Sequence, residues 1–220
     1  MPGEHRIGII ETSRPPASGA RESGVAIKLA VDAASEAETS RVTDVVSEAF
    51  LDDPTWSWAF PDPAVRRQWW TFCIREALRY PWTFTTEGFE TVSVWIPPDG
   101  SELSPGAELS VPARLIDLVG DRASDVGELL ERFGRAHPRD EPHYYLSLLG
   151  TAREHRGRRL GMALLEENLA RIDAEHMPAY LESSNPNNNH RYESVGFVAV
   201  SSFQAPGDGP AVTGMWRAKR

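Results

Sequence analysis

The sequence predicts a mixed α/β domain in which helices flank one central sheet. Segments with apolar residues at helical spacing are interleaved along the chain with short runs rich in β-branched and aromatic residues. Hydrophobic residues make up 40% of the 220 positions and include seven tryptophans, which is enough for a substantial core. The expected order is strand, two helices, hairpin, helices, strand, helix, strand, helix and two strands.

The first part of the chain differs from the rest in composition. Residues 1–25 combine Pro, Gly, Ser and charged residues without periodicity, which predicts a flexible N-terminal tail. The apolar run at residues 26–33 predicts a short strand. We therefore expect the folded domain to occupy residues 26–220.

The next segment carries clear signals for where helices start and stop. Ser35 and Glu38 have the Ser-x-x-Glu spacing of a capping box, so a helix is expected from this point to about Leu51. Prolines interrupt residues 52–63, which predicts a loop with exposed aromatic side chains. A second helix is expected over residues 63–80, where apolar residues recur at helical spacing.

The remaining elements follow from the same patterns. Two β-rich runs around the letters EGFE predict a hairpin over residues 82–98. Two helical patterns, separated near Gly120, occupy residues 109–136. The later elements are a strand at 143–151, a helix at 160–175, a strand at 179–184, a short helix at 187–195 and strands at 197–203 and 211–217.

Composition and charge exclude several classes of protein. The chain has 32 acidic and 23 basic residues, a formal net charge of -9, which argues against a nucleic-acid binder that needs a broad basic face. A single cysteine, Cys73, excludes a disulfide framework, and its position on the apolar face of a helix predicts a buried, inert thiol. Because no apolar run approaches the length of a membrane span or a signal peptide, a cytoplasmic protein without membrane association is expected.

Positive charge and glycine are nevertheless concentrated at one point, in the letters REHRGRRLGMALLEENL of residues 153–169. A strand that ends in a glycine-bearing loop and enters a helix forms an anion site, because the first N–H groups of the helix have no intrahelical partner. Glycine lets a phosphate approach the main chain, and arginine adds charge-assisted hydrogen bonds. The pattern predicts binding of a di- or polyphosphate. The residues in this group are Arg153, Arg156, Gly157, Arg158, Arg159 and Gly161.

The spacing of these residues distinguishes between the known phosphate-binding motifs. Neither G-x-x-x-x-G-K-[ST] nor G-x-G-x-x-G is present. The letters RGRRLG, from Arg156 to Gly161, instead resemble the Arg/Gln-x-x-Gly-x-Gly/Ala signature of the GNAT acyl-CoA N-acyltransferases. The resemblance extends to HYYLSLLGTAREHRGRRLGMALLEENL, which is similar to the family's fourth strand, loop and third helix, and to AYLESSNPNNNHRYESVGF further on. The letters TVSVWIPP are similar to the branch that includes puromycin N-acetyltransferase.

This resemblance implies a GNAT fold, with a mostly antiparallel sheet of about seven strands whose fourth and fifth strands splay apart, and acetyl-CoA as the cofactor. It implies main-chain contacts to the pantetheine arm along the fourth strand, where Gly150 suits a bulge or a close approach. One position departs from the family, since Arg159 stands where glycine is usual. Its side chain either contacts a cofactor phosphate or lies in solvent. The implied cofactor-binding residues are Leu149, Gly150, Thr151, Arg156, Gly157, Arg158, Arg159, Leu160, Gly161 and Asn188.

The resemblance also places a tyrosine, Tyr192, where the family has its general acid. A phenol held near the departing thiolate can protonate it, since the two groups have ordinary pKa values of about 10 and 8.5. The alternative is that Tyr192 is a packing residue at the start of the C-terminal part of the domain. Asn188 lies one helical turn earlier, on the same face, and either contacts the cofactor or caps a helix.

The general base has several candidates. An ammonium must lose a proton before it attacks the thioester, and a carboxylate, a histidine or a water chain can take that proton. Glu182, on the strand after the phosphate loop, is the first candidate. His143 is the second and His190 the third, and a base that acts only through water stays open.

The acceptor is expected to be a small primary amine, such as an antibiotic or amino-nucleoside. Trp56 and Trp58, in a loop with two aspartates, are candidates to line a pocket for a cationic, partly apolar amine. No His/Cys cluster has the spacing of metal ligands. Alternatives are acetylation of a protein N-terminus or lysine, and a non-catalytic module that binds acyl-CoA. A monomer and a homodimer are both compatible with the sequence.

Overall fold

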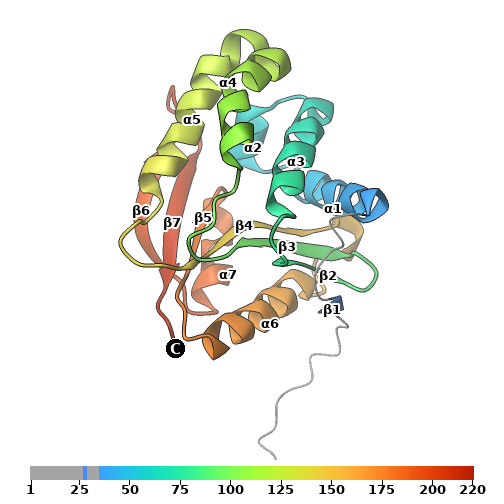
Figure 1. Cartoon of the computed structure of the whole chain (residues 1–220), viewed down its shortest axis with the longest axis vertical. Helices are drawn as coiled ribbons and strands as arrows, with labels where there is room; N and C mark the ends of the chain where they lie inside the picture. Colours follow the sequence, from blue (N-terminus) through green and yellow to red (C-terminus); the bar gives the residue numbers. More distant parts are fainter. Residues whose placement is uncertain (1–26, 29–34) are drawn as a thin grey trace, which may run out of the picture.

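A computed structural model describes residues 27–28 and 35–220 of the chain. These residues form one seven-stranded sheet in the order β1-β2-β3-β4-β5-β7-β6, in which only the β4–β5 pair is parallel (Figure 1). The predicted mixed, mostly antiparallel sheet of about seven strands is therefore confirmed. The strands are β1 Ile27–Lys28, β2 Thr83–Thr86, β3 Thr91–Ile96, β4 Tyr144–Thr151, β5 Ala179–Ser183, β6 Val198–Gln204 and β7 Ala211–Arg217.

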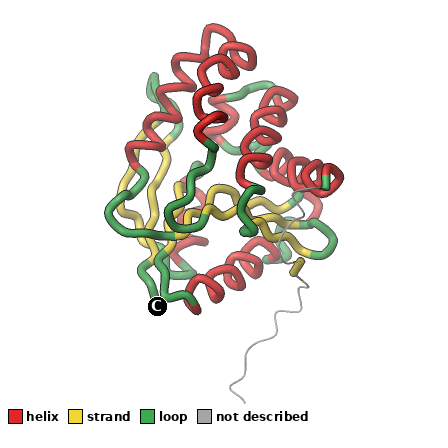
Figure 2. Tube along the Cα trace, viewed as in Figure 1, coloured by secondary structure: helices red, strands yellow, loops and turns green. Residues whose placement is uncertain are grey.

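The helices cover both faces of this sheet, as the coloured tube of Figure 2 shows. Helices α1 and α3 pack together over one face, around a core that includes Val46, Trp70 and Val94, whereas α6 covers the other face through Leu164 and Leu165. Helices α4 and α5 pack against each other above the β6–β7 end (Figure 1). The bounds are α1 Glu36–Ala49, α2 Pro54–Ala59, α3 Pro63–Ala77, α4 Pro105–Val119, α5 Ala123–Ala136, α6 Leu160–Ala174 and α7 Asn189–Glu193, with 3-10 turns at Gly120–Arg122, Arg153–His155 and Pro186–Asn188.

Local capping chemistry explains where these helices begin. Ser35 accepts a hydrogen bond from the Glu38 N–H, as the capping-box spacing predicts. The expectation of a loop over residues 52–63 is wrong in part, because this segment contains the helix α2. Asp53 accepts hydrogen bonds from two N–H groups at its start, and Pro54 occupies the first helical position, where proline favours a helix start and does not break the helix.

The centre of the sheet opens between β4 and β5. The parallel pairing ends at Leu146 and Leu181, although β4 continues to Thr151 and β5 continues alongside β7. In β4, the register against β3 shifts between Leu146 and Leu148, so Ser147 is the extra residue of a β-bulge. The splay that the family resemblance implied is present, and main-chain groups beyond it have no neighbouring strand on that side.

The start of the chain is only partly described. Residues 27–28 form β1 and pair with β2, which agrees with part of the strand predicted at residues 26–33. The predicted tail over residues 1–25 lies outside the described residues. Within the described part, no helix has the length and apolar character required to cross a bilayer.

Candidate functional site

A cleft of about 2160 Å³ runs from the start of α6, across the β4–β5 opening, to the inner sides of α4 and α5. Its volume exceeds the roughly 300–1,000 Å³ of a typical small-ligand pocket, so two ligands fit side by side. Most of the predicted site residues line this cleft. They are Leu149, Gly150, Thr151, Arg156, Gly157, Arg159, Leu160, Gly161, Glu182, His143, His190, Asn188, Tyr192 and Trp56.

The predicted phosphate-binding loop lies at the start of α6. The first intrahelical hydrogen bond at this end runs from the Ala163 N–H to the Arg159 carbonyl, which leaves the N–H groups of the first helical turn without a carbonyl below them. Gly157 has φ +79°, a conformation that side chains rarely adopt, and open space lies where its Cβ would be. The loop therefore offers an anion cradle made of backbone.

Two further glycines bring helices close to β4. A Cβ on Gly150 would lie 2.7 Å from the Ala49 Cβ of α1, and a Cβ on Gly161 would lie 2.8 Å from the Thr151 Oγ1. Both distances are too short for unbonded atoms, so these positions require glycine for packing. Gly150 thus serves the close approach, whereas the bulge that was its other predicted role lies at Ser147.

Two of the four arginines tie this loop to the end of α1. Arg156 donates to the Ala49 carbonyl at 2.8 Å, and Arg153 pairs with Asp52 at 2.6 Å. The last carbonyls of α1 carry partial negative charge, which these cations offset. Arg156 also lines the cleft, so it lies beside the cradle while it holds the two elements together.

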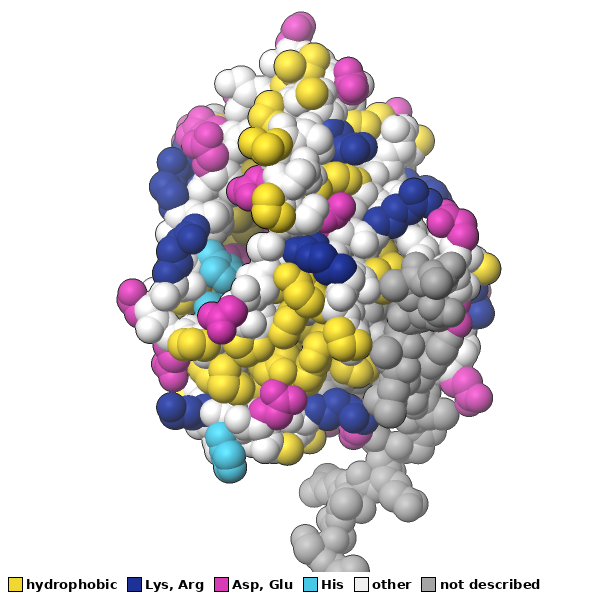
Figure 3. Space-filling view, in the orientation of Figure 1, with side chains coloured by type: hydrophobic (Ala, Val, Ile, Leu, Met, Phe, Trp, Pro, Cys, Tyr) yellow, Lys and Arg dark blue, Asp and Glu magenta, His cyan; other side chains and the backbone are white. Residues whose placement is uncertain are grey.

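The other two arginines point away from the cradle. Arg158 contacts His155 Nδ1 at 2.9 Å and is absent from the described lining of the cleft. Arg159 has the left-handed backbone of φ +61° and ψ +13°, and its side chain is 80% exposed with a loose 3.7 Å ion pair to Glu166. The family's usual glycine adopts this conformation without strain. On the face of the molecule that Figure 3 shows, the basic side chains are dispersed among acidic ones.

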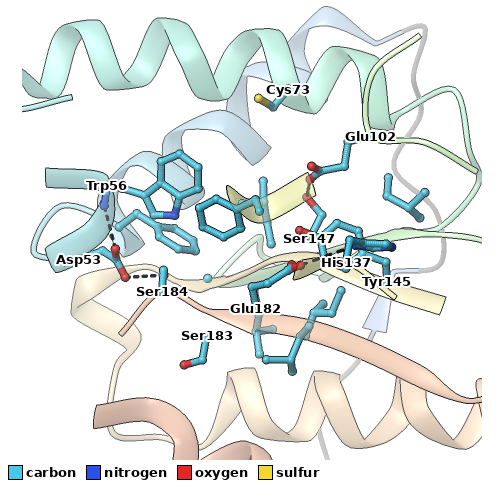
Figure 4. Close-up of a pocket in the computed structure, with 18 of the residues that line it drawn as sticks. Asp53, Trp56, Cys73, Glu102, His137, Tyr145, Ser147, Glu182, Ser183 and Ser184 are labelled. Carbon is cyan, nitrogen blue, oxygen red and sulfur yellow. Dashed lines mark hydrogen bonds and ion pairs between the residues drawn. The ribbon is translucent and has the colours of Figure 1, made fainter. Parts of the chain in front are cut away.

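At the other end of the cleft, Glu182 is the most enclosed acidic group. Its side chain is 1% exposed, and neither carboxylate oxygen meets the geometry of a hydrogen bond among the described residues, although the phenols of Tyr145 and Tyr180 lie close to it. The imidazole of His137 also lies beside it, with Nδ1 3.6 Å from Glu182 Oε1 (Figure 4). A buried carboxylate without hydrogen bonds is costly, and such groups gather at functional sites.

The other two base candidates differ in their surroundings. His143 is buried, which lowers its pKa, and its Nδ1 lies 2.7 Å from the Glu141 carbonyl. Its Nε2 faces His137 Nε2 at 3.2 Å, so His143 lies behind Glu182. His190 lies at the exposed surface of α7.

A second carboxylate, Glu102, lies across from Glu182 on the segment between β3 and α4. Ser147, the bulge residue, donates a hydrogen bond to its carboxylate (Figure 4). Enclosure in the cleft raises the pKa of Glu102, and the negative charge of Glu182 adds to the rise. Burial also holds the pKa of Tyr145 far above its usual value, and both carboxylates contribute. This end of the cleft therefore favours a cation.

Sequence reasoning missed Glu102, His137 and Tyr145. Glu102 and His137 belong to no recognisable motif, and Tyr145 belongs to a strand that was interpreted through its backbone alone. The Glu102 loop is fixed by contacts with the end of α3 and the residues just after it. Arg79 donates to the Glu102 carbonyl at 2.9 Å, and Glu76 accepts from the Ser104 N–H at 2.9 Å.

Tyr192, on α7, lines the cleft. Its ring makes an edge contact with Phe197, with ring centroids 6.3 Å apart. Enclosure by the protein raises the pKa of Tyr192 to about 12, and the negative charge of Asp53 contributes. The phenol therefore stays protonated at physiological pH and can donate a hydrogen bond into the cleft.

The surroundings of Asn188, Trp56 and Trp58 bear on the roles predicted for them. Asn188 makes no capping hydrogen bond, and Asn185 caps the preceding 3-10 turn instead. Trp56 lines the cleft and stacks on Phe133 with centroids 5.8 Å apart. Trp58 is absent from the described lining of the cleft, and the Arg122 guanidinium lies over its ring, 5.1 Å from the centroid.

Asp53 links the start of α2 to Ser184, the residue that follows β5. Its carboxylate caps α2 and accepts a hydrogen bond from Ser184 Oγ at 2.7 Å (Figure 4). Thr55 Oγ1 donates in turn to the Ser184 carbonyl at 2.7 Å. Burial raises the pKa of Asp53 more than these hydrogen bonds lower it. Among the described residues, no group of three or more His, Cys, Asp or Glu is arranged to hold a metal ion.

Comparisons with known proteins agree with this geometry. Residues 124–197 match the sequence profile of the acetyltransferase (GNAT) family. The fold is similar to that of histone acetyltransferase HPA2 and related acetyltransferase of Corynebacterium glutamicum, at 22% identity over 89% of this chain and 97% of that one, with a TM-score of 0.60. It is also similar to a Drosophila melanogaster polyamine N-acetyltransferase, at 17% identity, 88% and 99% coverage and a TM-score of 0.62. A chain of the NatC complex bound to Gag peptide and CoA matches at 14% identity, 89% and 99% coverage and a TM-score of 0.50.

The fold is GNAT-like, and its cleft joins an anion cradle to an acidic pocket. The match to the acetyltransferase (GNAT) family covers about a third of the chain, at residues 124–197. This match and the structural similarities support an acetyl-CoA-dependent N-acetyltransferase activity.

Proposed function

We propose that this protein transfers the acetyl group of acetyl-CoA to a primary amine of a small molecule, with Glu182 as the general base and Tyr192 as the general acid. One observation carries the proposal. The β4–β5 opening joins a backbone anion cradle at one end to a buried carboxylate without hydrogen bonds at the other.

The residues around the opening fit the cofactor. The unpaired N–H groups at the start of α6 and the open space at Gly157 suit a diphosphate, and the unpaired edge of β4 at Leu149, Gly150 and Thr151 suits an amide-bearing arm. Asn188 would contribute its amide, since it is not used for capping. When bound, acetyl-CoA supplies a thioester that an amine can attack.

The chain's own groups would manage the two protons of the reaction. Glu182 would hold the proton that the acceptor amine loses, because an ammonium cannot act as a nucleophile. Tyr192 would hold at its hydroxyl the proton that a departing thiolate needs. A phenol with a pKa of about 12 keeps this proton over the whole physiological range.

The acceptor is proposed to be cationic and partly apolar. Glu102 and Glu182 give this end of the cleft a negative charge, and Trp56 and Phe133 form a stacked aromatic surface beside it. The Drosophila melanogaster polyamine N-acetyltransferase of similar fold catalyses the formation of N-acetylagmatine. The resemblance of TVSVWIPP to the puromycin branch extends the proposal to amino-nucleosides.

The test measures CoA thiol release with a panel of polyamines, arylalkylamines, aminonucleosides and a lysine-containing peptide. A small amine is expected to be the preferred acceptor. Glu182→Gln and Tyr192→Phe are each expected to lower kcat at least 100-fold, the scale of general acid–base catalysis. Turnover of the peptide alone would favour a protein acetyltransferase, and acetyl-CoA binding without any turnover would favour a non-catalytic module.

A further inference from the structure

Two histidines form a chain behind the carboxylate that was assigned as the base. His137 follows the last residue of α5, and His143 immediately precedes β4. His137 Nδ1 lies 3.6 Å from Glu182 Oε1, and its Nε2 lies 3.2 Å from His143 Nε2. His143 Nδ1 lies 2.7 Å from the Glu141 carbonyl. The order of contacts is thus carboxylate, imidazole, imidazole and carbonyl.

The carbonyl at the far end fixes the protons along this chain. A carbonyl oxygen only accepts, so His143 Nδ1 must carry a hydrogen and donate it. Burial disfavours a charged His143, and its Nε2 therefore presents a lone pair. His137 Nε2 must donate to that lone pair. The remaining nitrogen of His137, Nδ1, is then a basic site directed at Glu182.

Aromatic rings hold both imidazoles in place. The His137 ring makes edge contacts with Tyr145 and Tyr180, with centroids 4.8 Å and 5.1 Å apart, and the His143 ring makes one with Trp216 at 5.1 Å. The His137 side chain nevertheless remains 30% exposed. It can therefore exchange a proton with water, whereas the Glu182 side chain, at 1% exposure, is nearly sealed.

We propose that His137 is a positioning residue for Glu182, which receives at Nδ1 the proton that Glu182 takes from the acceptor amine and then releases it to water. This inference rests on the proposed function. Before the attack, one N–H bond of the acceptor ammonium breaks and its proton moves to Glu182, then to His137 Nδ1, then to solvent, which frees the lone pair of the amine nitrogen. Glu182 returns to the carboxylate form, and His143 keeps His137 in the required tautomer.

Several other charged or titratable groups face this pair and contribute to its titration. Glu102, on the β3–α4 segment, interacts with both Glu182 and His137. The phenols of Tyr145 and Tyr180 are held neutral, because burial and the nearby carboxylate raise their pKa values. Glu141, which lies next to His143, forms an ion pair with Lys219, with 3.6 Å between Oε1 and Nζ.

The first test follows the six histidines by ¹⁵N NMR titration of the full chain, with and without Glu182→Gln. The expected result is a neutral His143 protonated on Nδ1, together with a His137 whose neutral form carries its hydrogen on Nε2 and whose Nδ1 resonance shifts in Glu182→Gln. A His143 protonated on Nε2, or a His137 Nδ1 resonance that is the same in wild type and Glu182→Gln, would overturn the proposal. This test needs no substrate, so it decides the inference even where acetyl transfer fails.

The second test measures kcat/KM against pH, because its acid limb reports groups of the free enzyme. Wild type is expected to lose activity as pH falls, because a His137 that already carries a proton on Nδ1 cannot accept another. His137→Asn should be at least tenfold slower on the plateau and should have its acid limb at lower pH, where only the carboxyl group titrates. His176→Asn, a surface substitution on the α6–β5 turn, should keep the wild-type profile.

The outcomes separate this inference from the proposed function. A wild type that acetylates no amine rejects the proposed function, and an unimpaired Glu182→Gln rejects the base assignment. A slowed Glu182→Gln together with a wild-type pH profile in His137→Asn rejects the role of His137 alone. Circular dichroism of each variant identifies any loss of fold. If His137→Asn loses its fold, the NMR titration of Glu182→Gln decides whether His137 has the proposed role.

Discussion

Arg159 offers a sharp test of how the phosphate loop is built. It is the N-cap of α6, and its backbone adopts the left-handed conformation, with φ +61° and ψ +13°. For a residue with a Cβ, this conformation costs roughly 1–2 kcal/mol, a cost that glycine does not incur. The unfolded chain gains freedom with glycine, which offsets roughly 0.4–1 kcal/mol. We expect Arg159→Gly to be more stable than Arg159→Ala by about 1 kcal/mol.

Comparing these two variants isolates the backbone contribution, because both remove the guanidinium. Arg159→Ala should match wild type to within about 0.5 kcal/mol, since the side chain is 80% exposed and its ion pair with Glu166 is loose at 3.7 Å. The assay is urea and thermal unfolding followed by circular dichroism. A gain of 1 kcal/mol corresponds to about 2–4 °C in Tm for a chain of this size. Equal or lower stability of Arg159→Gly would refute the strain argument.

The same variants decide between the two roles of the Arg159 side chain. Calorimetry with CoA should give Kd values within about twofold for wild type and Arg159→Ala, because the side chain points into solvent. A phosphate contact would instead weaken binding by about tenfold in Arg159→Ala, the typical worth of a charge-assisted hydrogen bond. That result would show that the guanidinium turns toward the cofactor on binding.

Two further predictions concern the packing around the site. Gly150→Ala should destabilise the fold by about 1–3 kcal/mol in urea unfolding, because its Cβ would lie 2.7 Å from α1, whereas the matched Gly134→Ala on α5 has open space and should stabilise by about 0.5 kcal/mol. Equal effects of the two substitutions would contradict the close approach. Asp173 makes a two-point ion pair with Arg217, whose side chain is 3% exposed, and this contact lowers the Asp173 pKa in the folded state. The stabilisation is therefore complete above the unfolded pKa of about 3.8 and is lost as pH falls through the lower folded pKa. Asp173→Asn should cost about 2 kcal/mol at pH 7 and flatten the pH dependence of stability below pH 4, and an unchanged acid unfolding curve would disprove it.

The sequence by itself determined those features that depend on residues close together in the chain. The order of strands and helices follows from local periodicity, and the capping box at Ser35 set a helix start that the structure reproduces. The phosphate loop could also be predicted from the sequence, since a strand, a loop with Gly157 and a helix follow one another directly within residues 144–174. The helix α2 was missed because six residues are too few for periodicity to show.

Tertiary structure alone decided the acidic end of the cleft. Glu102, His137 and Glu182 come from three separate segments, and no local pattern connects them. They meet because the β-bulge at Ser147 and the end of β4–β5 pairing open the sheet where α5 and the β3–α4 segment approach it. The sequence could name Glu182 as a candidate base, but its isolation from water and its histidine neighbour arise only when the packed elements exclude solvent.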